Sequence, residues 1–166
     1  MTPPAFAVAG WKDSGKTTLV ERLVAHLTAR GMNVGTVKRS HDAFLMDVEG
    51  TDTDRHRRAG ARSVAMIGPN GWTLARSGGE PAIETVLAAM TESDVVIVEG
   101  LKRGALPTIE VVADPSGEPI RAFNPHVFAV ACDDALAADL PVLRRDDIAG
   151  LAELALARLG LGPRPA

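Results

Sequence analysis

The sequence predicts an α/β fold: a mainly parallel sheet with helices on both faces, plus a β-hairpin. Short apolar runs predict strands that are buried on both faces, and segments with apolar residues at helical spacing alternate with them. This alternation is typical of parallel sheets, which bind ligands beyond the carboxyl ends of their strands. Functional residues are therefore expected where the predicted strands end.

The sheet is predicted to begin with the apolar run Ala5–Ala9, which has the pattern of a buried strand. Glycine-rich sequence follows it, and Lys16–Arg30 then predicts a helix whose leucines and valines recur at helical spacing. Asn33–Lys38 is the second predicted strand. The next segment, Arg39–Thr53, is polar and irregular, and a loop of this length favours a functional role.

The middle of the chain predicts a short helix and a hairpin. Either Thr51 or Asp52 can cap a helix over Thr53–Ala59. The runs Ser63–Ile67 and Trp72–Ala75 are expected to pair as a hairpin, because a Gly-Pro-Asn-Gly turn separates them.

The rest of the chain supplies the remaining elements. We expect a second core helix over Glu80–Met90 and a terminal amphipathic helix over Asp146–Leu159. Three further strands are predicted at Asp94–Glu99, Ile109–Ala113 and Val127–Cys132.

Composition narrows the class of protein. The 166 residues fit one domain over residues 1–166, and 46% hydrophobic with 23% charged residues is typical of a globular chain. A net charge of −3 argues against general nucleic-acid binding, and no apolar run nears the roughly 20 residues that span a bilayer. The N-terminus lacks the pattern of a secretory signal, and a single cysteine, Cys132, excludes an internal disulfide. We expect a soluble cytoplasmic domain that binds neither nucleic acid nor membrane.

A phosphate-binding motif joins the first strand to the first helix, because Gly10–Thr17 fits G-x-x-x-x-G-K-[ST] at every fixed position. Glycines let the backbone turn around a polyphosphate, so that successive N–H groups and the helix N-terminus point at its oxygens. Lys16, the predicted catalytic residue, adds a charge for the β- and γ-phosphates, and Thr17 can offer its hydroxyl to Mg²⁺. The motif predicts a P-loop NTPase-like nucleotide site. Its predicted residues are Gly10, Trp11, Lys12, Asp13, Ser14, Gly15, Lys16, Thr17 and Thr18.

Mg²⁺ beside the phosphates needs a carboxylate, held directly or through water. Asp94 and Glu99 flank one predicted strand and lie about 16 Å apart at roughly 3.3 Å per residue. Only the carboxyl end lies beside the phosphate loop, so Glu99 is the predicted metal ligand with Thr17, although it could be a solvated loop residue. Asp52, on the polar loop after the second strand, is the other candidate, and its alternative role is a helix N-cap.

Basic side chains gather near the predicted site. Lys38 ends the second strand, and Lys102 follows Glu99 closely. Four more cations lie on or after the predicted short helix: Arg55, Arg57, Arg58 and Arg62. Such residues can clamp phosphate, dock a cofactor or form a partner surface, whereas a solvated helix face is the alternative for most of them.

Two smaller features leave more than one interpretation open. His41 and His56 could share a metal with a nearby aspartate, but their spacing fits no standard zinc pattern. Asp133 follows the last predicted strand, where its carboxylate can accept hydrogen bonds from the N1–H and N2–H₂ of guanine, or act only as a loop acid. The chain contains no Asn-Lys-x-Asp motif, so the residues by themselves leave GTP and ATP equally open.

Together these motifs resemble the molybdopterin-guanine dinucleotide biosynthesis adapter family, MobB, over roughly residues 5 to 159. The matching segments are Gly10–Thr18, Lys38, His41, Gly50–Thr53, Arg57, Ala59–Ala61, Val98–Lys102, Pro107–Val111 and Ala131–Asp133. The phosphate loop alone is generic, and the other segments make the resemblance specific. The chain departs from residues frequent in relatives at Arg39, Asp42, Ala43, Leu101 and Thr108.

The resemblance implies a protein, commonly homodimeric, that binds GTP with Mg²⁺ and is at most a weak GTPase. It implies assistance to a MobA-type molybdopterin guanylyltransferase that attaches GMP to molybdopterin, and not the transferase activity itself. It favours guanine recognition by Asp133. It also implies that Lys38, His41, Arg57 and Lys102 contact the partner, molybdopterin or its guanine dinucleotide.

Two other classes of function remain open. In a small-molecule kinase, Arg55–Arg62 would form a mobile lid over the transferred phosphoryl group. In a metallochaperone GTPase, a cysteine pair or a histidine-rich tract is expected, and the chain has neither. No general base and no arginine finger in the same chain can be assigned, which is consistent with slow turnover.

Overall fold

The computed structural model describes residues 1–40 and 47–162. The chain forms two compact units, Met1–Arg39 with Ile83–Ala166, and Ser40–Ala82. The expectation of one domain over the whole chain stays a prediction. Among the helices of the described residues, none combines the length and the apolar character needed to cross a membrane.

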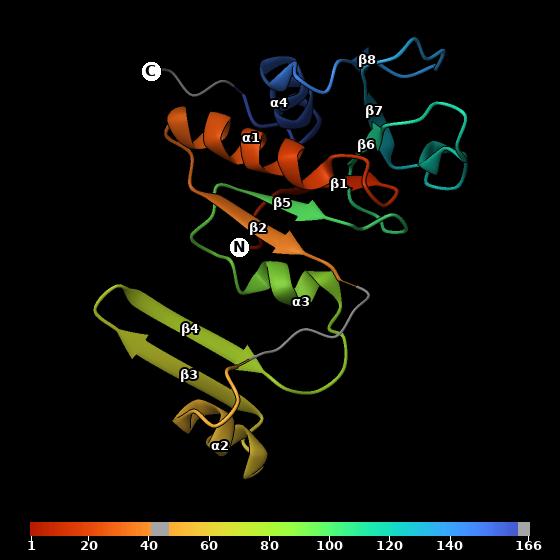
Figure 1. Cartoon of the computed structure of the whole chain (residues 1–166). Helices are drawn as coiled ribbons and strands as arrows, with labels where there is room; N and C mark the ends of the chain where they lie inside the picture. The colour runs from red at the N-terminus through yellow and green to blue at the C-terminus, as the bar shows by residue number, and fades with distance from the viewer. Residues whose placement is uncertain (41–46, 163–166) are drawn as a thin grey trace. The chain divides into compact units, whose positions relative to one another are not determined.

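The larger unit is built on a six-stranded sheet. Its strands are β1 Ala5–Gly10, β2 Val34–Lys38, β5 Val95–Glu99, β6 Thr108–Val112, β7 Val127–Cys132 and β8 Val142–Leu143. They follow the order β2-β5-β1-β6-β7-β8, and each neighbouring pair is parallel (Figure 1). The five predicted strands of the sheet are confirmed to within one residue at each end. The parallel order places the phosphate loop after the central strand β1, beside the ends of β5 and β6.

Helices cover both faces of this sheet, as predicted. The helix α1 spans Lys16–Ala29 and α4 spans Ile148–Arg158, and both lie on one face. On the other face lies α3, Ile83–Ala88 (Figure 1). A 3₁₀ turn, η1, follows β6 at Ile120–Ala122.

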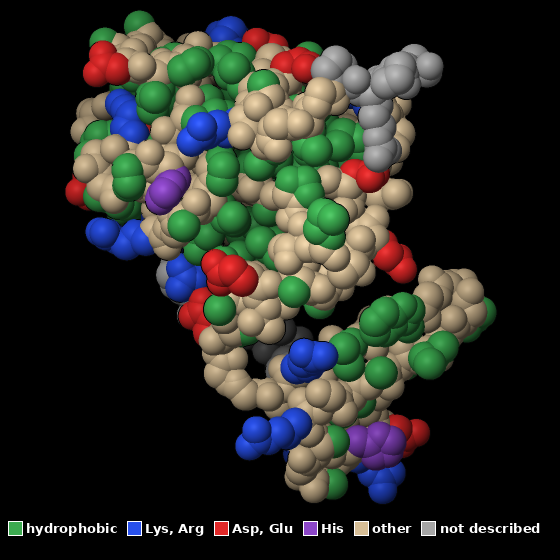
Figure 2. All heavy atoms as spheres, turned by 180° about the vertical axis from the view of Figure 1, so that it is seen from behind, with side chains coloured by type: hydrophobic (Ala, Val, Ile, Leu, Met, Phe, Trp, Pro, Cys, Tyr) green, Lys and Arg blue, Asp and Glu red, His purple; other side chains and the backbone are tan. Residues whose placement is uncertain are grey.

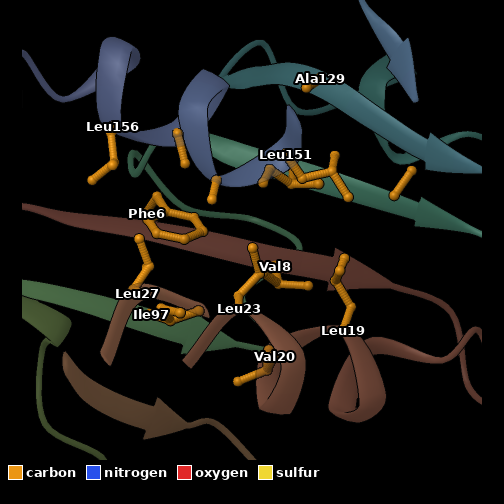
Figure 3. Close-up of a cluster of buried hydrophobic side chains, with 14 of the residues drawn as sticks. Phe6, Val8, Leu19, Val20, Leu23, Leu27, Ile97, Ala129, Leu151 and Leu156 are labelled. Carbon is orange, nitrogen blue, oxygen red and sulfur yellow. The ribbon is translucent and has the colours of Figure 1, made fainter. Parts of the chain in front are cut away.

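Alternating side chains of β1 supply both layers of the core. Phe6 and Val8 point toward α1 and α4, where they pack with Leu23 and other fully buried side chains (Figure 3). Ala7 points to the opposite face and packs in the layer beneath α3. Complete burial of a Phe or Leu side chain contributes about 1.5–3 kcal/mol, so this double layer holds the strand that carries the phosphate loop.

The smaller unit contains α2 Asp52–Arg58 and a two-stranded antiparallel sheet of β3 Ser63–Gly68 and β4 Gly71–Arg76. The predicted hairpin is confirmed. Of the two predicted caps, Thr51 is the N-cap, because its side chain accepts from the backbone N–H of Asp54. Asp52, the other candidate cap, is instead the first residue of the helix.

The second predicted core helix is confirmed, but it covers only Ile83–Ala88 and not the whole of Glu80–Met90. A proline at position 81 disfavours helical backbone at the residue before it. At the other end, the N–H groups of Ala89 and Met90 donate to carbonyls three residues earlier rather than four. The regular helix therefore lasts less than two turns. Sequence patterns also missed the short β8 and η1.

Candidate nucleotide-binding site

The phosphate loop leaves β1 at Gly10 and enters α1 at Lys16. It turns through two left-handed residues, Asp13 with φ 60° and Gly15 with φ 89°. A Cβ atom on Gly10 would lie 2.3 Å from the Ser14 Oγ and 2.7 Å from the Val111 carbonyl oxygen, so the loop closes too tightly for a side chain there. The first N–H groups of an α-helix have no partner within the helix, so the start of α1 is suited to binding an anion such as phosphate.

Lys16, the first residue of α1, folds its side chain back over the loop. Its Nζ donates to the Trp11 carbonyl oxygen at 2.5 Å and lies 3.5 Å from the Ser14 Oγ. Burial lowers the pKa of Lys16, and the nearby Glu99 carboxylate opposes that shift. An anionic phosphate is a stronger hydrogen-bond partner for an ammonium than a neutral carbonyl oxygen is. The Lys16 ammonium can therefore leave the Trp11 carbonyl oxygen for a phosphate bound in the loop.

Glu99 and Thr17 meet directly beside the loop. The Thr17 Oγ1 donates to the Glu99 Oε1 at 2.8 Å. Glu99 ends β5, pairs in register with Val8 of β1, and is only 9% exposed, so it is not a solvated loop residue. A hydroxyl and a carboxylate at the end of a strand next to a phosphate loop form the oxygen donor set that suits Mg²⁺.

Two predicted contact residues, Lys38 and Lys102, lie around this pair. Lys38 ends β2 opposite Glu99 in the parallel register, with its Nζ 3.7 Å from the Glu99 Oε1. The Lys102 Nζ lies 4.0 Å from the centre of the Trp11 ring, a cation–π contact. The buried Asn124 donates to the Lys102 carbonyl oxygen at 3.0 Å and anchors that backbone.

Asp133 lies after β7, at the same edge of the sheet, and both of its oxygens are engaged by Arg145. The Arg145 backbone N–H donates to Oδ1 at 2.9 Å, and its Nε donates to Oδ2 at 2.7 Å. These contacts, the backbone hydrogen bond first, lower the pKa of Asp133. Arg145 also donates to the Ser14 carbonyl oxygen at 3.3 Å, which connects Asp133 to the phosphate loop.

Two predicted site residues, Asp52 and Arg57, belong to the smaller unit. The Asp52 side chain is 91% exposed, and its Oδ1 lies 3.7 Å from the Arg55 Nη1. Arg57 instead pairs with the buried Asp54 at 2.5 Å. His41 lies in the segment 41–46 that is not described. Within residues 1–40 and 47–162 no group of three or more metal-ligating side chains is found.

The sequence patterns missed one contributor to this region, Arg145, and the side-chain contact of another, Trp11. Arg145 lies two residues after β8, a strand that was not predicted. In the sequence, only its place next to Arg144 in a pair of arginines could have pointed to it. Trp11 was assigned through its place in the motif, but its side chain also matters, because the indole N–H donates to the Glu118 carbonyl oxygen at 2.7 Å. A cavity of about 330 Å³ lies behind the loop, lined by Trp11, Ser14, Glu110 and the segment after β6.

Comparisons with known proteins agree with this architecture. The family model described as molybdopterin guanine dinucleotide synthesis protein B, MobB, matches residues 5–133. The molybdopterin-guanine dinucleotide biosynthesis adapter protein of Haemophilus influenzae is 31% identical over 153 residues, which cover 90% of this chain and 86% of that protein. The adapter protein of the same description from Escherichia coli is 31% identical over 157 residues, covering 90% of each chain.

Solved structures give the same result for the fold. A crystal structure of molybdopterin-guanine biosynthesis protein B matches with a TM-score of 0.74 and 27% identity, covering 94% of this chain and 99% of the other. Bacillus subtilis MobB matches with a TM-score of 0.76 and 25% identity, covering 94% and 98%. The family model matches well over half of the chain, and its phosphate loop, Glu99 and Asp133 all fall inside the matched residues. This chain therefore belongs to the MobB family of molybdopterin guanine dinucleotide synthesis proteins.

Proposed function

We propose that this chain is a GTP-binding adapter in molybdopterin guanine dinucleotide synthesis and hydrolyses GTP slowly at most. The adapter role rests on membership of the MobB family and on the names of the adapter proteins that the chain resembles. The nucleotide role rests on one observation above all, the 2.8 Å hydrogen bond from Thr17 to Glu99 beside the phosphate loop. A glycine-rich turn that only connects a strand to a helix does not require a hydroxyl and a buried carboxylate beside it.

In the proposed complex, the loop and the residues beside it compensate the negative charge of the nucleotide phosphates. The N–H groups of the loop and the Lys16 ammonium bind the β- and γ-phosphates. Thr17 and Glu99 would hold Mg²⁺, which neutralises phosphate charge when it is bound. Asp52 stays a second proposed carboxylate for that ion. No general base and no arginine finger is assigned among these groups, so slow hydrolysis is expected.

Guanine recognition is proposed for Asp133, and it requires an exchange of partners. Arg145 engages both carboxylate oxygens, so the N1–H and N2–H₂ of guanine must replace at least the guanidinium contact. The lowered pKa of Asp133 supports this role, because an ionised carboxylate accepts hydrogen bonds from both groups of the base.

The proposed partners are a MobA-type guanylyltransferase, molybdopterin or its guanine dinucleotide, and a second copy of this chain. Lys38, His41, Arg57 and Lys102 are the proposed contacts for the first two. The cytoplasm is the proposed location for this biosynthetic adapter role.

Calorimetric titration with GTP and ATP, each with and without Mg²⁺, tests the nucleotide role directly. We expect GTP to bind more tightly than ATP and Mg²⁺ to strengthen binding. Lys16→Ala should weaken GTP binding by about a hundredfold, since it removes a charge-assisted contact from a partly buried site. Arg22→Ala, at an exposed position of α1, is the matched control. Lys16→Ala protein that holds GTP as tightly as the parent would overturn the proposal.

The adapter role has a separate measurement. Added to a MobA-type enzyme with GTP and molybdopterin, the chain should raise the yield of molybdopterin guanine dinucleotide, and Lys16→Ala should remove that increase. A chain that forms the dinucleotide without the enzyme would contradict the adapter role.

A further inference from the structure

The lysines of this chain are unusually placed. The sequence has four lysines and 14 arginines, and the lysines lie only in the phosphate loop, at the end of β2 and just after β5. They are Lys12, Lys16, Lys38 and Lys102. These three segments meet at the carboxyl edge of neighbouring parallel strands. Lysine differs from arginine in presenting a compact, mobile point charge, which suits a phosphate whose position changes between bound states.

Three of these ammonium groups act on the same small region. Lys16 begins α1 beside Thr17, Lys38 lies opposite Glu99 in the parallel register, and the Lys102 ammonium lies against the Trp11 ring of the loop. The Glu99 Oε1 accepts from Thr17 at 2.8 Å and lies 3.7 Å from the Lys38 Nζ. Glu99 therefore joins the Thr17 hydroxyl, where the metal is proposed, to the ammonium of Lys38.

Lys38 and Lys102 are held differently. The Lys102 ammonium lies against the Trp11 ring, and its backbone is anchored by Asn124. The Lys38 side chain is 67% exposed, and its separation of 3.7 Å from Glu99 is longer than a hydrogen bond. A half-exposed pair of this kind is weak, so Lys38 can leave Glu99 at little cost. Its backbone, in contrast, is fixed by the β2–β5 pairing.

We propose that Lys38 binds the terminal phosphate of a nucleoside triphosphate and thereby distinguishes the triphosphate from the diphosphate. This inference rests on the proposed nucleotide-binding function, and it assigns Lys38 to the nucleotide in place of the partner or molybdopterin contact proposed above. The loop N–H groups and Lys16 contact the β-phosphate and one side of the γ-phosphate, and the other side of the γ-phosphate extends toward the Thr17–Glu99 pair and therefore toward Lys38. A cation bound at Glu99 satisfies that carboxylate and leaves the Lys38 ammonium available to the terminal phosphate.

The test compares Lys38→Met with the parent in calorimetric titrations with GDP and with a non-hydrolysable GTP analogue, both in Mg²⁺. We expect affinity for the analogue to fall about tenfold, the size of one charge-assisted contact, and affinity for GDP to change less than twofold. Lys38→Arg, which keeps the charge, should restore most of the difference. Arg22→Met removes an exposed charge from α1 and should leave both affinities unchanged. Circular dichroism checks that each variant is folded.

The outcomes separate this inference from the function on which it rests. A parent chain that binds neither nucleotide overturns the proposed function and the Lys38 assignment together. A parent that binds both, with Lys38→Met weakening them equally or not at all, overturns the Lys38 assignment alone. Selective loss of the triphosphate, with recovery in Lys38→Arg, supports it.

Discussion

At the residue scale, Glu99 is the central residue of the candidate site, because its one buried carboxylate interacts with two other site residues. Its Oε1 accepts from the Thr17 hydroxyl and faces the Lys38 ammonium. At 9% exposure, little water is available to solvate its charge. A divalent cation on this oxygen would compensate the charge far better than the weak pair with Lys38 does.

Glu99→Gln tests the role of that charge. The amide oxygen can still accept from Thr17, so the loop should keep its shape, but the negative charge is lost. We expect Mg²⁺ to strengthen GTP binding at least about tenfold less than in the parent, while binding without Mg²⁺ is equal or tighter. Titration with and without chelator measures both values. Equal Mg²⁺ dependence in parent and variant would remove Glu99 from the metal site.

At the scale of the element, β6 and η1 are joined by a buried ion pair behind the phosphate loop. Glu110, 1% exposed, accepts from the Ile120 backbone N–H at 2.6 Å and from the Arg121 guanidinium at 2.7 Å. The same segment holds Trp11 through the Glu118 carbonyl oxygen. The hydrogen bond from Trp11 to Glu118 therefore supports the phosphate loop from the segment that follows β6.

Glu110→Gln should therefore destabilise the larger unit. It leaves the Arg121 guanidinium without its buried counter-charge, a change that costs about 3 kcal/mol of unfolding free energy. Urea denaturation measures the loss. Glu21→Gln, at an exposed position of α1, should stay within about 0.5 kcal/mol of the parent. An equal, small effect of both substitutions would show that the ion pair contributes little to the fold.

The smaller unit depends on another buried carboxylate, that of Asp54. The Gly50 backbone N–H lowers the pKa of Asp54, and Arg58 and Arg57 lower it further against the opposing effect of burial. A folded-state pKa below the unfolded value stabilises the unit above the unfolded pKa of about 3.9. That stabilisation is lost as the pH falls through the folded pKa.

Hydrogen exchange of the α2 amides, corrected for intrinsic rates, measures this dependence. Protection should be constant from pH 7 to about pH 5 and fall below about pH 4. In Asp54→Asn, protection should be lower at neutral pH and should change less with acid. A parent whose α2 protection is unchanged down to pH 2 would exclude Asp54 as the responsible group.

At the scale of the whole molecule, the hairpin presents an apolar face. Ile67 pairs with Trp72, and Leu74 lies two residues further along the same face. These side chains are 85%, 68% and 44% exposed, and Figure 2 shows hydrophobic side chains gathered on the hairpin. A two-stranded sheet is marginally stable alone, so this face favours a contact with the second copy proposed above.

Replacing Ile67 and Trp72 together with serine should shift the chain toward monomer, because it removes the largest apolar side chains from that face. Sedimentation velocity over a range of concentrations measures the change. Arg62→Ser, beside the same strand, is the control. A parent that is monomeric at every concentration, or a double variant that still dimerises, would exclude this face as the interface.

Sequence patterns were enough to predict the parallel α/β fold, the position of the glycine-rich loop, and the placement of Glu99, rather than Asp94, at the strand end beside that loop. These features rest on local patterns, such as apolar runs and glycine spacing, or on the rule that parallel strands end at one edge. Asp52 and Thr51 were indistinguishable as caps, because either side chain can accept from a helix N–H.

Only the tertiary structure decided which charges meet. The contacts of Glu99 with Thr17 and Lys38, and of Arg145 with Asp133 and Ser14, join residues from separate strands and loops. No periodicity encodes such pairs, since they depend on strand order and on the rotamers that packing permits. For the same reason, the division into two units and the short α3 became visible only in the folded chain.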